Sequence, residues 1–244
     1  MKKYWKIVEE VINQVDVVLE IVDARMPELT RNKKIESMVF AKRKRLIVVC
    51  NKADLINQNN FSKDKRFVYV STKKRFGFAK LRKTIMGNKE VVRVGVVGYP
   101  NTGKSSVINS LVGRKKALTS SVAGFTKGVQ WITDHKGLLL YDTPGVIPFD
   151  ENDEIKKAIM CVLSPSQIKD PYLVALKIIE IFLNENKSAL ETKYNIKASN
   201  DAEDVLLEIG KKMNYLVKNG EIDVTRTCIK IIKDWQQGLL FLNA

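Results

Sequence analysis

A glycine-rich segment in the middle of the chain carries the strongest chemical signal. Residues 98–105 read Gly-Tyr-Pro-Asn-Thr-Gly-Lys-Ser and match the phosphate-loop pattern Gly-x-x-x-x-Gly-Lys-Ser/Thr. In such a loop the backbone N–H groups turn onto phosphate, and the helix that follows directs the positive end of its dipole at the same anion. Lys104 is expected to reach the β- and γ-phosphates, and the Ser105 hydroxyl to bind Mg²⁺. We predict nucleoside triphosphate binding by the consecutive residues Tyr99, Pro100, Asn101, Thr102, Gly103, Lys104, Ser105 and Ser106.

A second motif of this kind follows an apolar segment over residues 138–141. Asp142-Thr143-Pro144-Gly145 places a carboxylate at the end of a predicted strand and a glycine three residues later. Such an aspartate holds Mg²⁺ through a water molecule, and the glycine N–H meets the γ-phosphate. Between the two motifs, the hydroxyl of Thr126 is a candidate to complete the Mg²⁺ coordination. We therefore expect Ser105, Thr126 and Asp142 at the metal, and Lys104, Thr126 and Gly145 in hydrolysis.

Base recognition is predicted for two further strand ends. In Asn51-Lys52-Ala53-Asp54, the carboxylate of Asp54 can accept hydrogen bonds from guanine N1–H and the 2-amino group. Adenine offers no such pair of donors, so the site favours guanine. Asn51 would brace the loop, and the aliphatic stem of Lys52 would pack over the base. Ser71-Thr72-Lys73 would bring a backbone N–H near guanine O6, so we predict a GTP/GDP site.

The elements that must hold these motifs are apolar strands that alternate with helices. Strands are predicted over residues 17–22, 46–50, 67–70, 91–97, 128–133 and 137–141. Helices are predicted over residues 2–14, 33–42, 78–86 and 104–111, and then near 172–183, 201–213 and 224–237. This order predicts the α/β class, with a P-loop GTPase domain around a mostly parallel six-stranded sheet over residues 1–164. A small all-α domain is predicted over residues 165–244.

Charge is distributed unevenly along the 244 residues, whose net charge is +15. Residues 1–150 carry 29 basic and 13 acidic groups, whereas residues 151–244 carry 13 and 14. The basic groups concentrate in residues 31–45 and 63–83. Such a field attracts polyanions by counterion release, which favours a nucleic-acid partner over an anionic membrane or a merely solvated surface.

Composition also excludes several classes of protein. No apolar run approaches the 18 residues of a membrane span, and no apolar region of a signal peptide follows the N-terminus. The cysteines Cys50, Cys161 and Cys228 lie far apart, with neither zinc-site spacing nor a disulfide framework. We therefore expect a cytoplasmic protein, and we expect it to be a monomer.

The order of the motifs points to a family. In Ras-like GTPases the phosphate loop comes first, but here Asn51–Asp54 and Ser71–Lys73 precede it, as in a circular permutation. Asp23-Ala24-Arg25-Met26-Pro27 matches a DARxP element, and residues 123–128 are similar to a PGxT switch with Ala in place of Pro. Residues 206–212 and 220–223 are similar to parts of a helical C-terminal domain, and together these features make the chain resemble the circularly permuted GTPases of ribosome assembly, the RbgA/YlqF type. The resemblance implies a GTPase that acts on the large ribosomal subunit or its precursor and contacts rRNA.

The resemblance also shows where this chain departs from its relatives. Ras-like enzymes orient the attacking water with a Gln after the Asp-x-x-Gly motif, whereas Val146 stands here. Asn101 matches the position at which related GTPases bind K⁺, so the resemblance implies a K⁺ that assists hydrolysis. The N-terminal histidine of bacterial members is absent, and the single histidine, His135, falls in a predicted turn. The Lys- and Ile-rich composition without that histidine favours an archaeal member.

Two other functions fit the same motifs. The protein could be a GTP-controlled RNA-binding switch whose hydrolysis is incidental, or a GTPase that acts on tRNA or translation factors. For the assembly factor we expect slow turnover alone and stimulation by the ribosomal subunit. We also expect the segment after Gly145 to couple the γ-phosphate to the helical domain.

Overall fold

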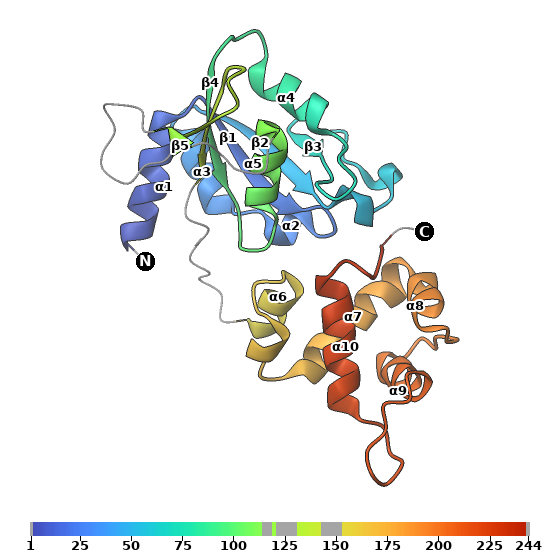
Figure 1. Cartoon of the computed structure of the whole chain (residues 1–244). Coiled ribbons are helices and arrows are strands. Elements are labelled where there is room, and N and C mark those ends of the chain that lie inside the picture. The colour runs from blue at the N-terminus through green and yellow to red at the C-terminus, as the bar shows by residue number, and fades with distance from the viewer. Residues whose placement is uncertain (1, 114–118, 121–130, 143–152, 243–244) are drawn as a thin grey trace. The chain divides into compact units, whose positions relative to one another are not determined.

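The chain folds into two compact units, which are described separately. The computed structural model describes residues 2–113, 119–120, 131–142 and 153–242 (Figure 1). The first unit comprises residues 1–54 and 58–150, and the second comprises residues 55–57 and 151–244. No helix within these described ranges is long and apolar enough to cross a membrane.

The first unit is built on a sheet of seven strands in the order β3-β2-β1-β4-β7-β6-β5. The strands are β1 (Val17–Asp23), β2 (Arg45–Asn51), β3 (Phe67–Tyr69), β4 (Val92–Val97), β5 (Thr119–Ser120), β6 (Trp131–Thr133) and β7 (Leu138–Asp142). The first five strands of that order are parallel, whereas β6 and β5 are antiparallel additions at one edge. The predicted α/β class is confirmed. The sheet has one strand more than predicted because the two-residue β5 has no apolar run that could reveal it.

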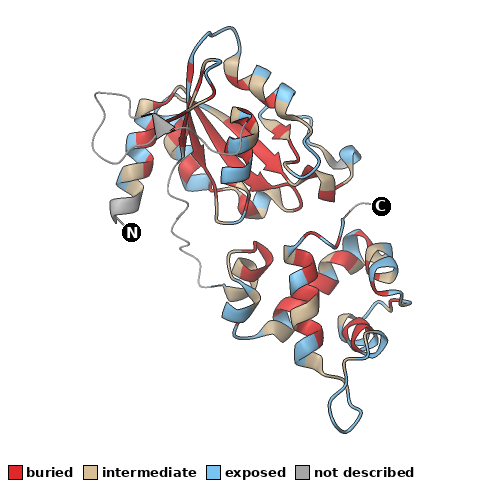
Figure 2. Cartoon of the chain, in the orientation of Figure 1, coloured by how far each residue is buried: buried red, intermediate tan, exposed pale blue. Residues whose placement is uncertain are grey.

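Helices cover both faces of the sheet. They are α1 (Lys2–Gln14), α2 (Pro27–Thr30), α3 (Lys33–Ala41), α4 (Phe78–Met86) and α5 (Lys104–Val112). Helices α1 and α3 pack on one face, where Ile12 and Ile35 meet Val18 of β1. Helices α4 and α5 pack on the other face against Leu19 of β1. All seven residues of β1 are therefore buried, and Figure 2 shows the strands of the sheet as its buried centre.

The second unit is all-α, as predicted. Its helices are α6 (Glu154–Ile159), α7 (Pro171–Glu185), α8 (Lys187–Tyr194), α9 (Ala202–Lys212) and α10 (Val224–Gln236). Aspartates cap four of these helices by accepting hydrogen bonds from N–H groups of the first turn: Asp153, Asp170, Asp201 and Asp223. Phe182 and Trp235 meet edge to face in the core, with ring centroids 5.8 Å apart.

The division between the units differs from the predicted boundary at residue 164. Trp235 Nε1 donates to the carbonyl of Ile159 at 2.8 Å, and Gln236 Nε2 donates to the carbonyl of Leu163 at 2.9 Å. These bonds tie α6 and the segment after it to α10, so residues 153–164 belong to the helical unit. No sequence pattern marks this tie, because the residues it joins are far apart in the chain.

Candidate nucleotide-binding site

The predicted motifs meet at one edge of the sheet. The phosphate loop follows β4, the Asn51–Asp54 loop follows β2, the Ser71–Lys73 loop follows β3, and Asp142 ends β7. These strands run parallel, so their carboxyl ends share one edge, where α/β proteins bind ligands. The permuted order of the motifs therefore leaves them together in space. Thr126 and Gly145 lie outside the described residues, and so does the side chain of Asp142.

A single buried amide joins the two loops that are predicted to recognise the base to the phosphate loop. Asn51 Nδ2 donates to the carbonyl of Thr102 at 2.9 Å, and Thr72 N donates to Asn51 Oδ1 at 3.4 Å. Gly103, with φ +93°, passes so close that an added Cβ would lie 2.2 Å from Asn51 Nδ2. Only glycine tolerates both this backbone conformation and this approach. Asn51 thus fixes how far apart a base and its phosphates would be held.

The phosphate loop is wound tightly against the sheet. At Gly98, with φ +147°, an added Cβ would lie 2.4 Å from the carbonyl oxygen of Ile21. Lys104 is 8% exposed, and its Nζ donates to the carbonyl of Tyr99 at 2.8 Å. The same carbonyl accepts from Thr102 Oγ1 at 2.9 Å, so the loop is braced from within.

The remaining residues of the phosphate loop face solvent or the helix that follows. Asn101 is exposed with φ +61°, and Pro100 is half-buried. Ser105 and Ser106 lie exposed in the first turn of α5, whose N-terminus begins directly after Gly103. A helix N-terminus supplies unpaired N–H groups and a positive dipole end, so the loop has the donors that a phosphate needs.

The carboxylate that is predicted to recognise the base is oriented by a serine. Ser71 is fully buried, and its Oγ donates to Asp54 Oδ1 at 2.6 Å while accepting from Lys74 N at 2.9 Å. Lys73, two residues after Ser71, is exposed. The two loops that sequence assigned to the base are thus linked through Ser71 and Asp54.

A buried aspartate holds Lys52, which is predicted to pack over the base, and the sequence did not reveal this contact. Asp23, at the end of β1, is 2% exposed. Its carboxylate accepts from Lys52 Nζ at 2.7 Å and from Arg25 at 2.7 Å and 3.0 Å. Burial alone would raise the pKa of Asp23, but the two cations hold it well below its usual range. The sequence singled out residues 23–27 only by their resemblance to a family element. The signal that could have predicted this contact was a carboxylate at a strand end with an Arg two residues later.

A second chain of contacts links Glu20 of β1 and Asn32, before α3, to Tyr99 of the phosphate loop. Asn32 caps α3, its N–H donates to Glu20 Oε1 at 2.6 Å, and its Nδ2 donates to the Tyr99 hydroxyl at 3.1 Å. Burial raises the pKa of Glu20 well above its usual range. The sequence did not reveal this contact, although a lone Glu within an apolar strand was a visible signal.

The donors suit a magnesium nucleotide. The described residues hold no cluster of His, Cys, Asp or Glu that would bind a metal without a ligand. Ser105 and Asp142 instead lie on neighbouring elements, since Asp142 pairs with Val96 of β4 just before the phosphate loop. Bound there with phosphate, Mg²⁺ would neutralise charge on the phosphate oxygens. A metal that depends on the nucleotide fits these residues.

His135 lies away from this edge. It is exposed in a turn with φ +55°, just before the amino end of β7, whereas the motifs follow carboxyl ends. The prediction of a solvated turn residue is confirmed.

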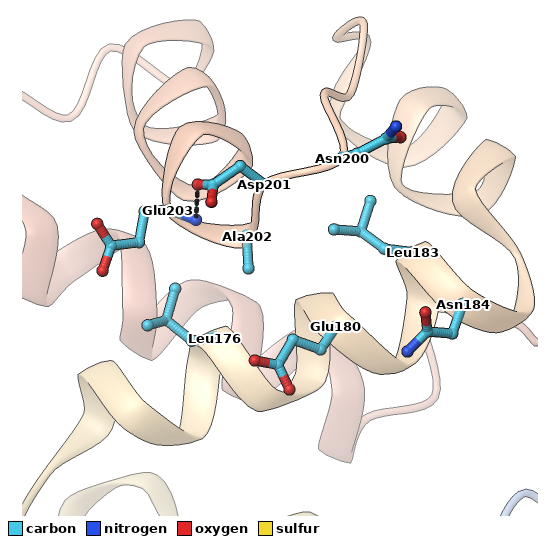
Figure 3. Close-up of a pocket in the computed structure, with 8 residues that line it drawn as sticks. All are labelled: Leu176, Glu180, Leu183, Asn184, Asn200, Asp201, Ala202 and Glu203. Carbon is cyan, nitrogen blue, oxygen red and sulfur yellow. Dashed lines mark hydrogen bonds between the residues drawn. The ribbon is translucent and has the colours of Figure 1, made fainter.

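A pocket of about 360 Å³ lies in the helical unit, between α7 and α9 (Figure 3). Its lining includes the acidic side chains of Glu180, Asp201 and Glu203, and Asp201 caps α9 by accepting from Glu203 N at 2.9 Å. Acidic walls repel phosphate, so this pocket does not compete with the strand-end site for a nucleotide.

The fold and the site define a P-loop protein of the GTPase class whose motifs are circularly permuted. A family model described as "50S ribosome-binding GTPase" matches residues 93–218. The chain belongs to this family.

Relatives and solved structures agree. The "Uncharacterized GTP-binding protein MJ1464" of Methanocaldococcus jannaschii is 43% identical over 246 residues, which cover 96% of this chain and 65% of that protein. "Nuclear/nucleolar GTPase 2" of Arabidopsis thaliana is 32% identical over 258 residues, covering 97% and 44%. The chain therefore spans less than two thirds of either relative. GNP-bound YlqF from T. maritima superposes with a TM-score of 0.62 at 22% identity, over 98% of this chain and 96% of that one. The predicted resemblance to the RbgA/YlqF type is confirmed.

Proposed function

We propose that the protein hydrolyses GTP as an assembly factor of the large ribosomal subunit and cycles on and off particles that contain rRNA. The observation that carries the proposal is the Asn51–Thr102 bond, which joins the loop that we propose to read guanine to the phosphate loop. The family description and the nucleolar GTPases among the relatives support the ribosomal target. We propose that the protein acts as a cytoplasmic monomer.

The proposed role of each residue follows from its contacts. Asp54, oriented by Ser71, would accept from the guanine edge, and Lys52, held by Asp23, would lie over the base. Lys104 would exchange its bond to the Tyr99 carbonyl for the β- and γ-phosphates. We propose that Ser105, Thr126 and Asp142 bind Mg²⁺, and that the Gly145 N–H meets the γ-phosphate.

The attacking water needs help from outside these residues. Position 146 is Val, which cannot orient water, and His135 lies at the opposite edge of the sheet. We therefore propose that K⁺ held at Asn101 and the ribosomal particle together complete the catalytic site. Free protein should then turn over slowly, because the charge that an arginine finger supplies elsewhere would be missing.

RNA is the proposed partner because of the charge on the first unit. Residues 1–150 have an excess of 16 basic groups (29 less 13), whereas residues 151–244 have one more acidic than basic group (13 less 14). A polyanion such as rRNA would bind the first unit more strongly for this reason.

The test is GTP hydrolysis with purified large or small subunits, in KCl and in NaCl. We expect stimulation by large subunits, and more of it in KCl. Co-sedimentation of the protein with large subunits, in the presence of GTP, GDP or a non-hydrolysable analogue, would show in which nucleotide state it leaves the particle. Lys104→Ala is the control for contaminating GTPases. Equal turnover with and without either subunit, at saturating GTP, would refute the assembly role.

A further inference from the structure

The end of α3 exposes an aromatic side chain to an unusual degree. Phe40 is 86% exposed, more than any other large apolar side chain among the described residues; Val91 follows at 58%. A free aromatic ring on the surface forgoes a large gain from burial, and exposed apolar groups of this kind often mark a contact site.

The local fold holds this ring outward. Val39, the preceding residue, is buried against the sheet, which turns Phe40 away from the core. After Ala41 the chain reverses in a tight turn, in which Arg43 N donates to the Phe40 carbonyl at 2.9 Å and Lys44 N to the Val39 carbonyl at 3.0 Å. Arg43 adopts φ +51°, in the left-handed region, which is energetically unfavourable for residues other than glycine. Phe40 is thus presented by a rigid turn.

Basic groups surround the ring. We call residues 40–44 the Phe40 patch; a shallow cavity of about 490 Å³ is lined by Phe40, Ala41, Arg43 and Lys44. Lys44 Nζ is anchored on the carbonyl of Asn13 at 3.1 Å, and Lys42 pairs with Glu9 at 3.0 Å. The patch therefore contains three cations, Lys42, Arg43 and Lys44, against the single carboxylate of Glu9, so its net charge is positive. An aromatic face among cations fits nucleic acid with an unpaired base.

The patch lies where RNA would not compete with nucleotide. It directly precedes the amino end of β2, whereas Asn51 and the loop after it stand at the carboxyl end of the same strand. An RNA bound at Phe40 would leave the carboxyl edge of the sheet open.

We propose that Phe40 stacks on an unpaired base of RNA while Arg43 and Lys44 contact the phosphates beside it. This inference rests on the proposed function, since it identifies a surface by which the first unit binds rRNA. Stacking on one aromatic residue contributes about tenfold or more to affinity, and bases paired within a duplex are not accessible for it.

The experiment measures binding of the full chain to a fluorescent single-stranded oligoribonucleotide and to its duplex. Phe40→Ala should weaken single-strand binding about tenfold and leave duplex binding nearly unchanged. Phe40→Trp should retain the affinity, and RNA should quench the new tryptophan fluorescence. Arg43→Ala should lower the slope of log affinity against log salt by about one. Phe241→Ala, which removes a 42% exposed Phe from the second unit, is the matched control and should change nothing.

The outcomes separate this inference from the proposed function. Unchanged single-strand affinity of Phe40→Ala, with no quenching in Phe40→Trp, overturns the inference alone. Loss of subunit binding by Phe40→Ala with intact RNA affinity also overturns it, because the patch would then contact a protein. Failure of the wild-type chain to co-sediment with large subunits refutes the proposed function instead. Unchanged GTP affinity would verify that the variants are folded.

Discussion

The two units bury polar groups for different purposes. In the first unit, four buried charged residues, Glu20, Asp23, Arg25 and Lys104, lie on or just after β1 and β4, whereas a fifth, Asp134, pairs with Arg82 just before the amino end of β7. In the second unit, buried Asp234 accepts from Lys230 and from the Tyr194 hydroxyl, which ties α10 to α8. Burying charge is costly unless it is paired. The first unit bears this cost next to predicted ligand-binding residues, whereas the second bears it within a helix interface. A buried charge close to the carboxyl ends of the first unit's strands is therefore expected to affect binding, and one in the second unit only folding.

The largest expected effect compares two lysines. Lys104→Ala should lower GTP hydrolysis about a hundredfold or more, because one preorganised donor to transition-state charge is lost. Lys230→Ala should leave hydrolysis unchanged and destabilise the second unit by about 1–3 kcal/mol, because buried Asp234 loses a partner. Single-turnover hydrolysis and urea unfolding distinguish the two effects. Equal loss of hydrolysis in both variants would break the contrast between the units.

The next effect concerns the aspartate that holds Lys52. Asp23→Asn should cost about 3 kcal/mol at neutral pH, because Arg25 and Lys52 lose the carboxylate between them, and it should also weaken GTP binding. The folded pKa of Asp23 is lowered, so its stabilising effect is complete above about pH 4, the unfolded pKa. It disappears as the pH falls through the lowered folded value. The free energies of unfolding of Asp23→Asn and the wild type should therefore converge as the pH falls, and urea unfolding at a series of acidic pH values would measure this.

Asp64→Asn is the matched control for that measurement. Asp64 also pairs with an Arg two residues later, Arg66, but on the exposed surface, so no change is expected in stability or in GTP binding. If Asp23→Asn behaved like Asp64→Asn at neutral pH, the buried pair would not stabilise the base loop.

A third comparison uses two glycines with similar backbone angles. Gly103 and Gly220 have φ +93° and +83°, so alanine should cost about 1 kcal/mol at either. At Gly220 nothing lies within 4 Å of an added Cβ, whereas at Gly103 it meets Asn51. Gly103→Ala should therefore also weaken GTP binding, which titration of a fluorescent GTP analogue would measure. Similar GTP affinities in both variants would show that the contact between Gly103 and Asn51 does not determine the geometry of the GTP site.

Sequence patterns were sufficient for local features of the site. The apolar runs before Gly98, Asn51 and Asp142 predicted strands, and each motif therefore had to lie at a strand end. Parallel strands then placed the motifs at one edge, as the structure has them. This prediction succeeded because each strand and its motif are neighbours in the chain.

Contacts between distant residues could not be predicted in the same way. The bond from Lys52 to Asp23 joins residues 29 positions apart and exists because β1 happens to lie beside β2. The bond from Asn32 to Tyr99 spans 67 positions. The two-residue β5 has no sequence pattern that would predict a strand, and only its pairing with β6 identifies it as one. Strand order, which no local pattern encodes, decided all three.

The smallest expected effect is a change in how stability depends on pH. Burial, together with the charge of Glu36, raises the folded pKa of Glu20 to about 8, against the lowering effects of the Asn32 N–H and of Arg31. The folded state therefore holds a proton that the unfolded state has released between about pH 4.3 and pH 8, so this residue makes stability fall as the pH rises. Glu20→Gln keeps an acceptor for Asn32 N and removes the titration. The variant should gain relative stability across this window, with the difference greatest above pH 8.

The pH slope, rather than the size of the change, tests this account. Urea unfolding from pH 5 to pH 9 should give a flatter curve for Glu20→Gln than for wild type, because only the wild type must release a buried proton. Glu208→Gln, at an exposed position of α9 in the second unit, should leave the curve unchanged. Parallel curves for Glu20→Gln and wild type would mean that Glu20 is ionised in the fold. Its charge would then have to be compensated by Arg31, the cation that already opposes the rise in its pKa, and Glu20 would join Asp23 as a buried carboxylate that depends on a cation.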